Sequence, residues 1–268
     1  MISVVYHPFN SMNETPKNRC GWVRPGDNLY EQYHDTEWGV RTYDDRRLFE
    51  FLLLESAQAG LSWETILKKR AAYREAFAQF DPKKIARFSR RDIDRLMKNS
   101  GIVRHRLKIE AAISNARLFL EVQKEFGSFA KYLNQFVHEY PKSKQKRSLD
   151  DIPVLTEQSE ALTADLKARG FKFFGPVIAY AYMQAVGMVN DHTTDCFRYQ
   201  EIKKFGKKKT GVRMTSSAGK LIHSTAAEIS VTSSDTSGAV VPTSAELVRR
   251  SSRHCGTSSS VLLQTHLS

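Results

Sequence analysis

Apolar side chains recur every three or four residues along most of the chain from Asp44 onward, which is the spacing of one face of an α-helix. The first segment carries Leu48, Phe51 and Leu52 on that face, begins at Asp44 or Asp45, and ends before Gly60. No pair of alternating segments is joined by a hairpin turn, so the pattern predicts an all-α fold. Further helices are expected from Ser62 through Phe77, from Asp81-Pro82, from Ser89 or Arg90 through Leu96, over residues 109–120 with a stop at Gly127, from about Ser128, and over residues 159–169 and 176–186.

The remaining segments lack this pattern. Residues 139–151 are polar and Lys-rich and contain Pro141, which favours a surface loop. Residues 210–268 hold 22 Ser and Thr and no aromatic residue, so they are expected to bury too little apolar surface to fold. The sequence therefore predicts a flexible extension over residues 1–18, a helical domain over 19–202, and a basic, then Ser/Thr-rich, disordered tail over 203–268.

The charge balance narrows the class of partner. The net charge is +12, with 31 Lys and Arg against 25 Asp and Glu in residues 1–200, and 10 against 4 in residues 201–268. Basic surfaces bind phosphate backbones, so a polyanion is one candidate partner. No run reaches the roughly 18 apolar residues of a membrane helix, and the N-terminus lacks a signal-peptide pattern. With three Cys there is no disulfide framework, and we expect a soluble intracellular protein.

Two of the three cysteines lie near a histidine, and these two near-pairs stand at opposite ends of the predicted domain. They are Cys20 with His34, and His192 with Cys196. Two thiolates and two imidazoles are a ligand set that tetrahedral zinc accepts, and such a site would leave no position open for water. A structural metal site is therefore one hypothesis. Two buried thiols beside unrelated imidazoles are the alternative, because isolated Cys residues commonly pack as small hydrophobes.

A second feature is the short segment between the last two predicted helices. Two helices joined by a tight, Gly-flanked turn can form a helix-hairpin-helix, near residues 162–186, whose backbone N–H groups grip phosphate without reading base sequence. An ordinary turn with a capping Gly is the alternative. The residues expected to contact DNA here are Lys167, Arg169, Gly170, Lys172 and Gly175.

A third feature is Glu55, which stands seven residues after Leu48 on an apolar helix face. Burying a carboxylate costs several kcal/mol unless it has a partner, so Glu55 needs a structural role or a chemical one. Trp63 follows closely, and an aromatic ring with a carboxylate suits a cationic or electron-poor ring. The alternatives are that Trp63 belongs to the core and that Glu55 pairs with Arg46 or Arg74.

These features occur together in one known pattern. In order, the chain carries Cys20-Gly-Trp22, Tyr33-His34-Asp-Thr-Glu37-Trp38-Gly, Leu54-Glu55, Gln58-Ala-Gly-Leu-Ser-Trp63, Gly101-Ile-Val-Arg-His, Arg169-Gly-Phe-Lys-Phe, Tyr182-Met-Gln-Ala and Val189-Asn-Asp-His192. From about Cys20 to Arg198 the sequence closely resembles the 3-methyladenine DNA glycosylase I family of bacterial alkylation-repair enzymes. The resemblance implies a helix-hairpin-helix glycosylase fold, one structural zinc ion on Cys20, His34, His192 and Cys196, and a base pocket built from Tyr33, Glu55 and Trp63.

The chemistry implied by this family suits these residues. Adenine methylated at N3 is a cationic base and a good leaving group, so the enzyme must mainly flip it out of double-stranded DNA and hold it while water attacks the sugar. Trp63 would stack on the base, Tyr33 would close its other side, and Glu55 would accept hydrogen bonds and favour the charge as the catalytic residue. Gln58, Gly60 and Leu61 match the family's duplex-probing loop, with Leu61 as an apolar wedge. A monomeric, cytoplasmic, nucleoid-associated bacterial enzyme is expected.

Two departures from the family pattern concern the site. Many helix-hairpin-helix glycosylases activate water with an Asp where this chain has Asn190; the adjacent Asp191 is interpreted as a group supporting the zinc ligand His192. Asn134 replaces a Trp that the family usually places in the core or cavity lining. The alternative function is a catalytically silent, zinc-stabilised DNA-binding module, although such a module would not need Tyr33, Glu55 and Trp63 together.

Overall fold

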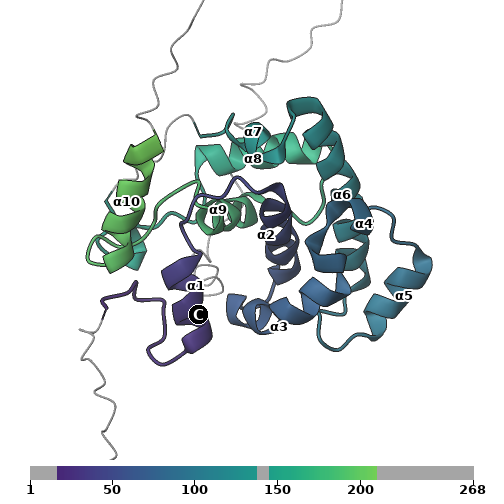
Figure 1. The fold of residues 1–268 in the computed structure, drawn as a ribbon, viewed down its shortest axis with the longest axis horizontal. Coiled ribbons are helices and arrows are strands. Elements are labelled where there is room, and N and C mark those ends of the chain that lie inside the picture. Colours follow the sequence, from purple (N-terminus) through teal and green to yellow (C-terminus); the bar gives the residue numbers. More distant parts are fainter. Residues whose placement is uncertain (1–16, 138–144, 210–268) are drawn as a thin grey trace, which may run out of the picture.

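Helix α2 (Asp45–Gln58) lies at the centre of the fold in the computed structural model, which describes residues 17–137 and 145–209 (Figure 1). Every α2 residue from Leu48 to Gln58 is buried, and α3, α6, α7 and α9 all pack against this helix. Asp44 caps it by accepting a hydrogen bond from the Arg47 N–H. The predicted helix from Asp44 or Asp45 to just before Gly60 is therefore confirmed.

The next elements also follow the predicted pattern. Ser62 caps α3 (Trp63–Ala76), Asp81 caps the short α4 (Pro82–Ile85), and Ser89 caps α5 (Arg90–Lys98). A 3-10 turn, η1 (Ala78–Phe80), connects α3 to α4. The long α6 (Arg106–Phe126) ends at Gly127, whose φ of 82° is left-handed. Ser128 then caps α7 (Phe129–Leu133), which is held beside α2 because Asp45 accepts hydrogen bonds from the Phe129 and Ala130 N–H groups.

Two packed helices, α8 (Glu157–Ala168) and α9 (Pro176–Ala185), complete the core and confirm the last two predicted helices. The turn η2 (Leu149–Asp151) precedes α8, and Lys146 before that turn forms an isolated bridge with Thr193, which follows α9. Residues 138–144, most of which fall in the predicted 139–151 loop, lie outside the described residues. The part of the chain that is described contains no strand, which agrees with the all-α prediction.

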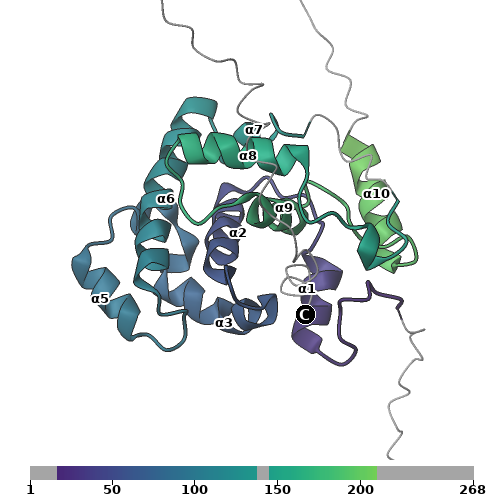
Figure 2. The same ribbon diagram turned by 180° about the vertical axis from the view of Figure 1, so that it is seen from behind.

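Two helices were not predicted from the sequence. The first, α1 (Asn28–Thr36), buries Tyr30, Tyr33 and His34 and is capped by Asp27. The other, α10 (Phe197–Lys209), extends past residue 202, where the domain was expected to end. Figures 1 and 2 show α1 and α10 on the same side of the molecule, opposite α5. The segment that precedes α1 is joined to the start of α10 by a hydrogen bond from the Phe197 N–H to the Asn18 carbonyl, 2.9 Å long.

The Asn134 substitution affects neither the core nor the cavity. Asn134 is exposed at the end of α7, where its side-chain oxygen accepts a hydrogen bond of 2.8 Å from Arg41. The expectation that an aromatic is lost from the core or cavity lining is therefore wrong for this chain. None of the helices in the described ranges is long and apolar enough to span a bilayer.

Candidate functional site

Cys20, His34, His192 and Cys196 converge in one buried cluster. Their ligand atoms all lie within 4.8 Å of one another, and no residue of the four is more than 2% exposed. The Cys196 sulfur lies 3.4 Å from His34 Nε2 and 3.5 Å from His192 Nδ1, and these two nitrogens are 3.2 Å apart. The predicted meeting of the two Cys–His near-pairs is thus observed, and the cluster could hold a metal ion.

The outer nitrogen of each imidazole is occupied by a hydrogen bond, which turns the other nitrogen toward the cluster. His34 Nδ1 donates to Asp35 at 2.8 Å, and His192 Nε2 donates to the Trp38 carbonyl at 3.1 Å. Asp35 is held in turn by the Arg19 guanidinium. Burial opposes ionisation of Asp35, but the hydrogen bonds from Arg19 and His34 outweigh it and lower the Asp35 pKa. Such outer contacts orient metal-binding imidazoles in proteins.

Proton sharing inside the cluster also suits a cation. The sulfur contact with Cys196, together with burial, raises the pKa of the Cys20 thiol, whereas the same contact lowers the pKa of Cys196. Burial lowers the pKa of His192, which keeps that ring neutral. The Cys196 thiolate and the neutral His192 ring are therefore available as ligands. A divalent cation would favour loss of the second thiol proton, that of Cys20.

A pocket adjoins the cluster. It is walled by α1, α2, the start of α3, α9 and the stretch after η2. The cluster and pocket share structural elements, because His34 follows Tyr33 on α1 and the His192 ring packs at 4.7 Å against Trp38. The pocket-lining residues are Trp22, Tyr33, Trp38, Glu55, Gln58, Trp63, Ile152, Pro153, Val154, Val177, Tyr180, Ala181 and Gln184.

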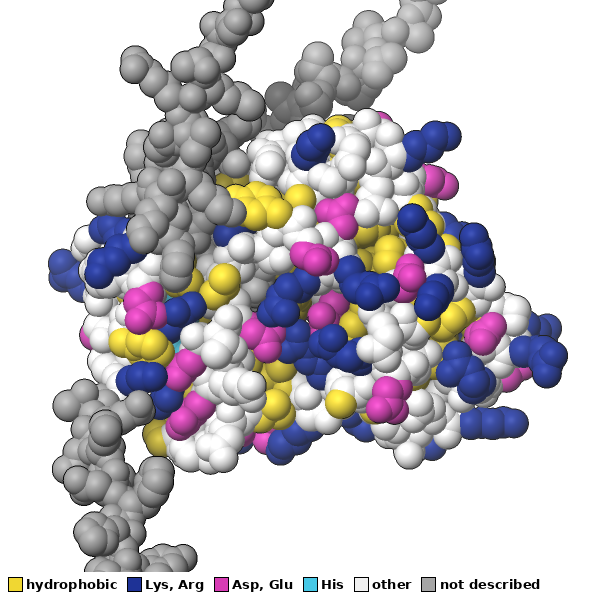
Figure 3. Space-filling model, viewed as in Figure 1, with side chains coloured by type: hydrophobic (Ala, Val, Ile, Leu, Met, Phe, Trp, Pro, Cys, Tyr) yellow, Lys and Arg dark blue, Asp and Glu magenta, His cyan; other side chains and the backbone are white. Residues whose placement is uncertain are grey.

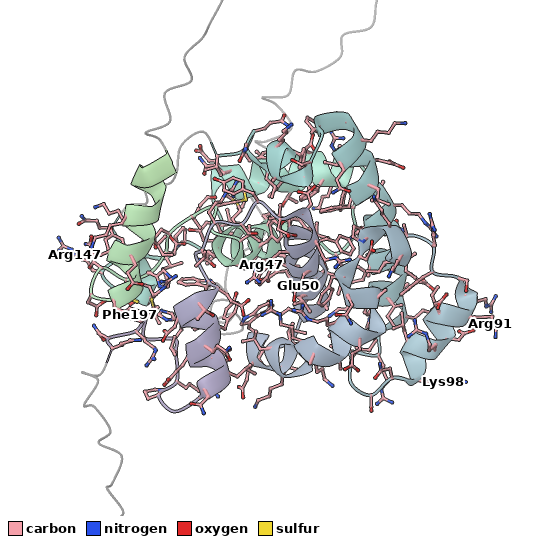
Figure 4. The ribbon with its side chains drawn as sticks, viewed as in Figure 1. Arg47, Glu50, Arg91, Lys98, Arg147 and Phe197 are labelled. Atoms are coloured by element: carbon pink, nitrogen blue, oxygen red, sulfur yellow. The ribbon has the colours of Figure 1, made fainter. Side chains whose placement is uncertain are left out.

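Glu55 is the buried carboxyl group of this pocket. It is 3% exposed, and burial raises its pKa from 4.5 to about 8. The two arginines considered as its partners bond elsewhere, Arg74 to Glu50 and Arg46 to Asp81. Figure 4 labels Glu50 on α2, where it belongs to an ion-pair network with Arg70 rather than to the pocket. At neutral pH the pocket therefore holds a mainly protonated carboxyl group that a cation would drive to ionise.

Tyr33 and Trp63 form adjoining walls of the pocket. Their ring centroids are 5.5 Å apart and the planes meet at 51°. A base stacked between two rings needs parallel faces about 7 Å apart, twice the usual contact distance. The structure therefore does not show Tyr33 closing the face opposite Trp63. The Trp63 indole N–H is buried without a hydrogen-bond acceptor among the described residues.

Sequence reasoning missed a polar pair on the α9 wall. Tyr180 and Gln184 are four residues apart on this otherwise apolar helix, and both donate hydrogen bonds to the Asp191 carboxylate, at 2.5 and 2.8 Å. Asp191 was interpreted as support for the neighbouring His192, but its contacts show that it anchors the pocket wall instead. Two polar residues at helical spacing within an apolar segment were the available signal.

The turn between α2 and α3 contains Gln58, Gly60 and Leu61. Gly60 has a φ of 80°, a left-handed conformation that favours glycine. Leu61 is half-buried against the core, and its N–H donates to the Gln58 carbonyl at 2.6 Å. The Nζ of Lys108 on α6 donates to the Ala57 and Ala59 carbonyls, at 2.8 and 2.6 Å, and so ties the end of α2 to this turn. Sequence reasoning did not single out Lys108.

The turn between α8 and α9 brings the other predicted DNA-contact residues together. Lys167 and Lys172 are exposed. Gly170 has a φ of 97°, a left-handed conformation that favours glycine, whereas Gly175 has a φ of −91°, which any residue can adopt. Arg169 bonds Glu125 and Asp165, at 2.6 and 2.7 Å, and these carboxylates offset its charge.

The comparisons with known proteins agree with this architecture. The fold and pocket define an all-helical protein in which an aromatic, carboxyl-bearing pocket adjoins a closed Cys/His cluster. The sequence profile of the methyladenine glycosylase family matches residues 22–199, and the chain belongs to that family.

Named relatives cover the same region. The DNA-3-methyladenine glycosylase 1 of Escherichia coli K12 is 49% identical over 181 residues, which are 68% of this chain and 96% of that protein. A crystal structure of a 3-methyladenine DNA glycosylase I is 53% identical with a TM-score of 0.65, covering 67% of this chain and 98% of the other. The Staphylococcus aureus enzyme, solved to explain its recognition of 3-methyladenine, is 42% identical with the same TM-score, over 68% and 96% of the two chains.

The raised pKa of Glu55 predicts a pH-dependent stability. Between about pH 4.5 and pH 8 the folded chain keeps this proton while the unfolded chain releases it, so wild-type stability falls as pH rises through that window. Glu55→Gln removes the effect. In urea unfolding, the free energy of unfolding of the variant should increase relative to that of wild type as pH rises, by on the order of a few kcal/mol at pH 8. Glu121→Gln, at an exposed position on α6, is the control; a gain for Glu55→Gln that does not change with pH would contradict this account.

Proposed function

We propose that this protein excises 3-methyladenine from alkylated double-stranded DNA by hydrolysing the N-glycosyl bond and leaving an abasic site. The observation that carries the proposal is the buried Glu55 carboxyl group in an aromatic pocket of a methyladenine glycosylase family member. Relatives named DNA-3-methyladenine glycosylase, and a solved complex of one family member with 3-methyladenine, support it.

In this mechanism, the pocket selects the base by its charge. A base methylated at N3 is cationic while it is attached to DNA, and ionisation of Glu55 becomes favourable when that cation enters. Trp63 and Tyr33 contact the flipped base as adjoining walls, and the Trp63 N–H is available to a base acceptor. Tyr180 and Gln184, held by Asp191, complete the α9 wall. The positive charge already weakens the bond to the sugar, so the pocket needs no strong acid.

DNA is engaged through two turns. The α8–α9 turn forms a helix-hairpin-helix that grips phosphates with backbone N–H groups, aided by Lys167 and Lys172. The α2–α3 turn probes the duplex, and Leu61 fills the gap left by the flipped base once it leaves its half-buried position. The enzyme acts as a monomer, and its DNA substrate places it at the nucleoid.

A catalytically silent DNA-binding module is less favoured than an enzyme. Backbone gripping needs only the hairpin and its charges, whereas this chain also keeps a buried carboxyl group among Trp and Tyr rings. Carrying that group without a cationic ligand lowers stability above about pH 4.5. A silent module would have no benefit to offset this cost.

The Cys/His cluster fits one structural zinc ion. Tetrahedral zinc with two sulfur and two nitrogen ligands has edges of about 3.3–3.8 Å. The nitrogen–nitrogen separation is 3.2 Å, three of the four sulfur–nitrogen separations are 3.4 to 3.5 Å, and all four ligand atoms lie within 4.8 Å of one another. The two sulfurs and two imidazoles fill all four positions, so zinc here would stabilise the fold and activate no water. The four residues of the cluster join the chain segments around α1 to the segment before α10.

Excision should depend on Glu55 and on pH. Wild-type protein should release free 3-methyladenine from methylated duplex, with kcat/KM rising as pH approaches about 8, because ionised Glu55 binds the cation. Glu55→Gln should lower kcat/KM by on the order of ten- to a hundred-fold and flatten the profile. Chromatography of released bases under limiting DNA measures both. Wild-type excision in the Gln variant would show that Glu55 is merely structural.

Zinc should accompany folding. Purified protein should contain one zinc per chain by elemental analysis, and Cys196→Ala should lower the free energy of unfolding by on the order of several kcal/mol, because structural zinc is coupled to folding. Ser89→Ala is the control: it removes the exposed cap of α5 and should lower the free energy of unfolding by only about 1 kcal/mol. Active, folded protein without zinc would contradict the assignment.

The hairpin should matter more for excision than the Ser/Thr-rich part of the tail. A Cβ on Gly175 would meet no atom within 4 Å, so Gly175→Val should leave the fold intact and obstruct only an approaching phosphate. We expect slower excision by this variant, with salt-sensitive duplex binding weakened equally for methylated and plain DNA. Deleting residues 210–268, which lie outside the described residues, should leave excision at saturating DNA unchanged. The reverse pattern would overturn the assignment.

A further inference from the structure

Two side chains on one face of α6 each hold the backbone of a different turn. Lys108 donates to the Ala57 and Ala59 carbonyls at the end of α2, and Asn115 bonds both the N–H and the carbonyl of Lys172 at 2.9 Å. Residues seven apart on an α-helix share a face and lie about 10 Å apart along its axis. One rigid helix therefore contacts both turns that are proposed to meet DNA.

These contacts are more than packing. Asn115 is 1% exposed, and its amide satisfies a donor and an acceptor of the hairpin turn. Burial lowers the pKa of Lys108, because desolvation disfavours its ammonium form. The last turn of α2 contains no basic residue of its own, so Lys108 supplies the cation that its carbonyl end favours.

The second turn has a backbone conformation that needs support from its surroundings. Phe173 has a φ of 54°, which is unfavourable for a side chain of that size, whereas the φ of 80° in the first turn belongs to Gly60 and is unstrained. The Phe173 ring packs edge-on against His105, the cap of α6, at 6.2 Å. A third α6 contact thus supports the hairpin turn beside Lys172.

We propose that Lys108 and Asn115 are positioning residues that fix the duplex-probing turn relative to the phosphate-gripping turn. This inference rests on the proposed function, because it assigns the two turns to one DNA duplex. Leu61 reaches the base stack only where the hairpin has fixed the strand, so a small error in their spacing misaligns the wedge. A misplacement of about 1 Å can cost on the order of a hundred-fold in rate.

The variants separate positioning from folding. Lys108→Met removes the hydrogen bonds to the α2–α3 turn, and Lys108→Arg restores donors at that place. Asn115→Asp keeps the acceptor for the Lys172 N–H but sets a carboxylate against its carbonyl. Lys69→Met is the matched control, because Lys69 also donates to a backbone carbonyl, that of Ser100, at 2.9 Å. All variants are compared below their melting temperatures.

The test compares single-turnover excision from methylated duplex at saturating DNA with binding of free 3-methyladenine. Lys108→Met and Asn115→Asp should each slow duplex excision by about ten-fold or more, with Kd for the free base within about two-fold of wild type. Lys108→Arg should recover most of the rate, and Lys69→Met should keep it. Equal losses of excision and free-base binding, or a wild-type rate in Lys108→Met, would overturn the proposal. Wild-type protein that releases no base would instead defeat the proposed function, and this inference with it.

Discussion

The closure of the Cys/His cluster is the constraint on which the pocket depends. It draws a segment before α1, α1 itself and the segment before α10 into one buried contact, although Cys20 and Cys196 are 176 positions apart in the chain. This closure also places two residues of the pocket wall. Tyr33 is next to the cluster residue His34 in the chain, and the Trp38 carbonyl accepts a hydrogen bond from the cluster residue His192. Without this closure, the nine-residue α1 would be held only by its packing on α3 and the burial of Tyr30 and Tyr33, because a helix this short does not persist by itself.

The second constraint is electrostatic. Figure 3 shows Lys and Arg side chains along the edge that α5 occupies and a mixture of both charges across the central face; Figure 4 labels Arg91 and Lys98 on α5 and Arg47 near the centre. On that central face Glu37 bonds both Arg47 and Arg70. Glu55 lies instead in an apolar wall that raises its pKa to about 8. Glu37 thus lies among cations, whereas Glu55 lies buried in the pocket, where desolvation favours its protonated form.

The sequence allowed the long helices and the meeting of the Cys/His cluster to be predicted for different reasons. The α2, α3 and α6 segments place apolar residues at helical spacing, and each has a recognisable boundary residue: Asp44, Ser62 and Gly127. The cluster was recognisable because the chain has so few cysteines. In contrast, α1 shows mostly polar and aromatic residues, and its helix depends on tertiary contacts. Trp22 and Trp38 could not be told from core residues, since only the convergence of separate segments makes them pocket walls.

The turn residues show a further limit of sequence reasoning. Residue type suggested that Arg169 was a phosphate ligand, but Glu125 on α6 lies close enough to bind it. In the same way, Lys108 is one of many lysines until its distance to the Ala57 carbonyl is known. The role of a charged side chain depends on which groups lie near it in the folded structure. Helical periodicity in the sequence does not determine those neighbours.

Proton release on binding is the most direct test of a pocket selective for a cationic base. Calorimetric titration at pH 7, in buffers of different ionisation enthalpy, can count the protons released when an adenine alkylated at N3 and N9, which carries a fixed positive charge, enters the pocket. Because Glu55 has a pKa of about 8 in the free protein, wild type should release about one proton per bound base. Glu55→Gln should bind more weakly and release none. Tight binding of the cation by wild type with no proton released would contradict the account.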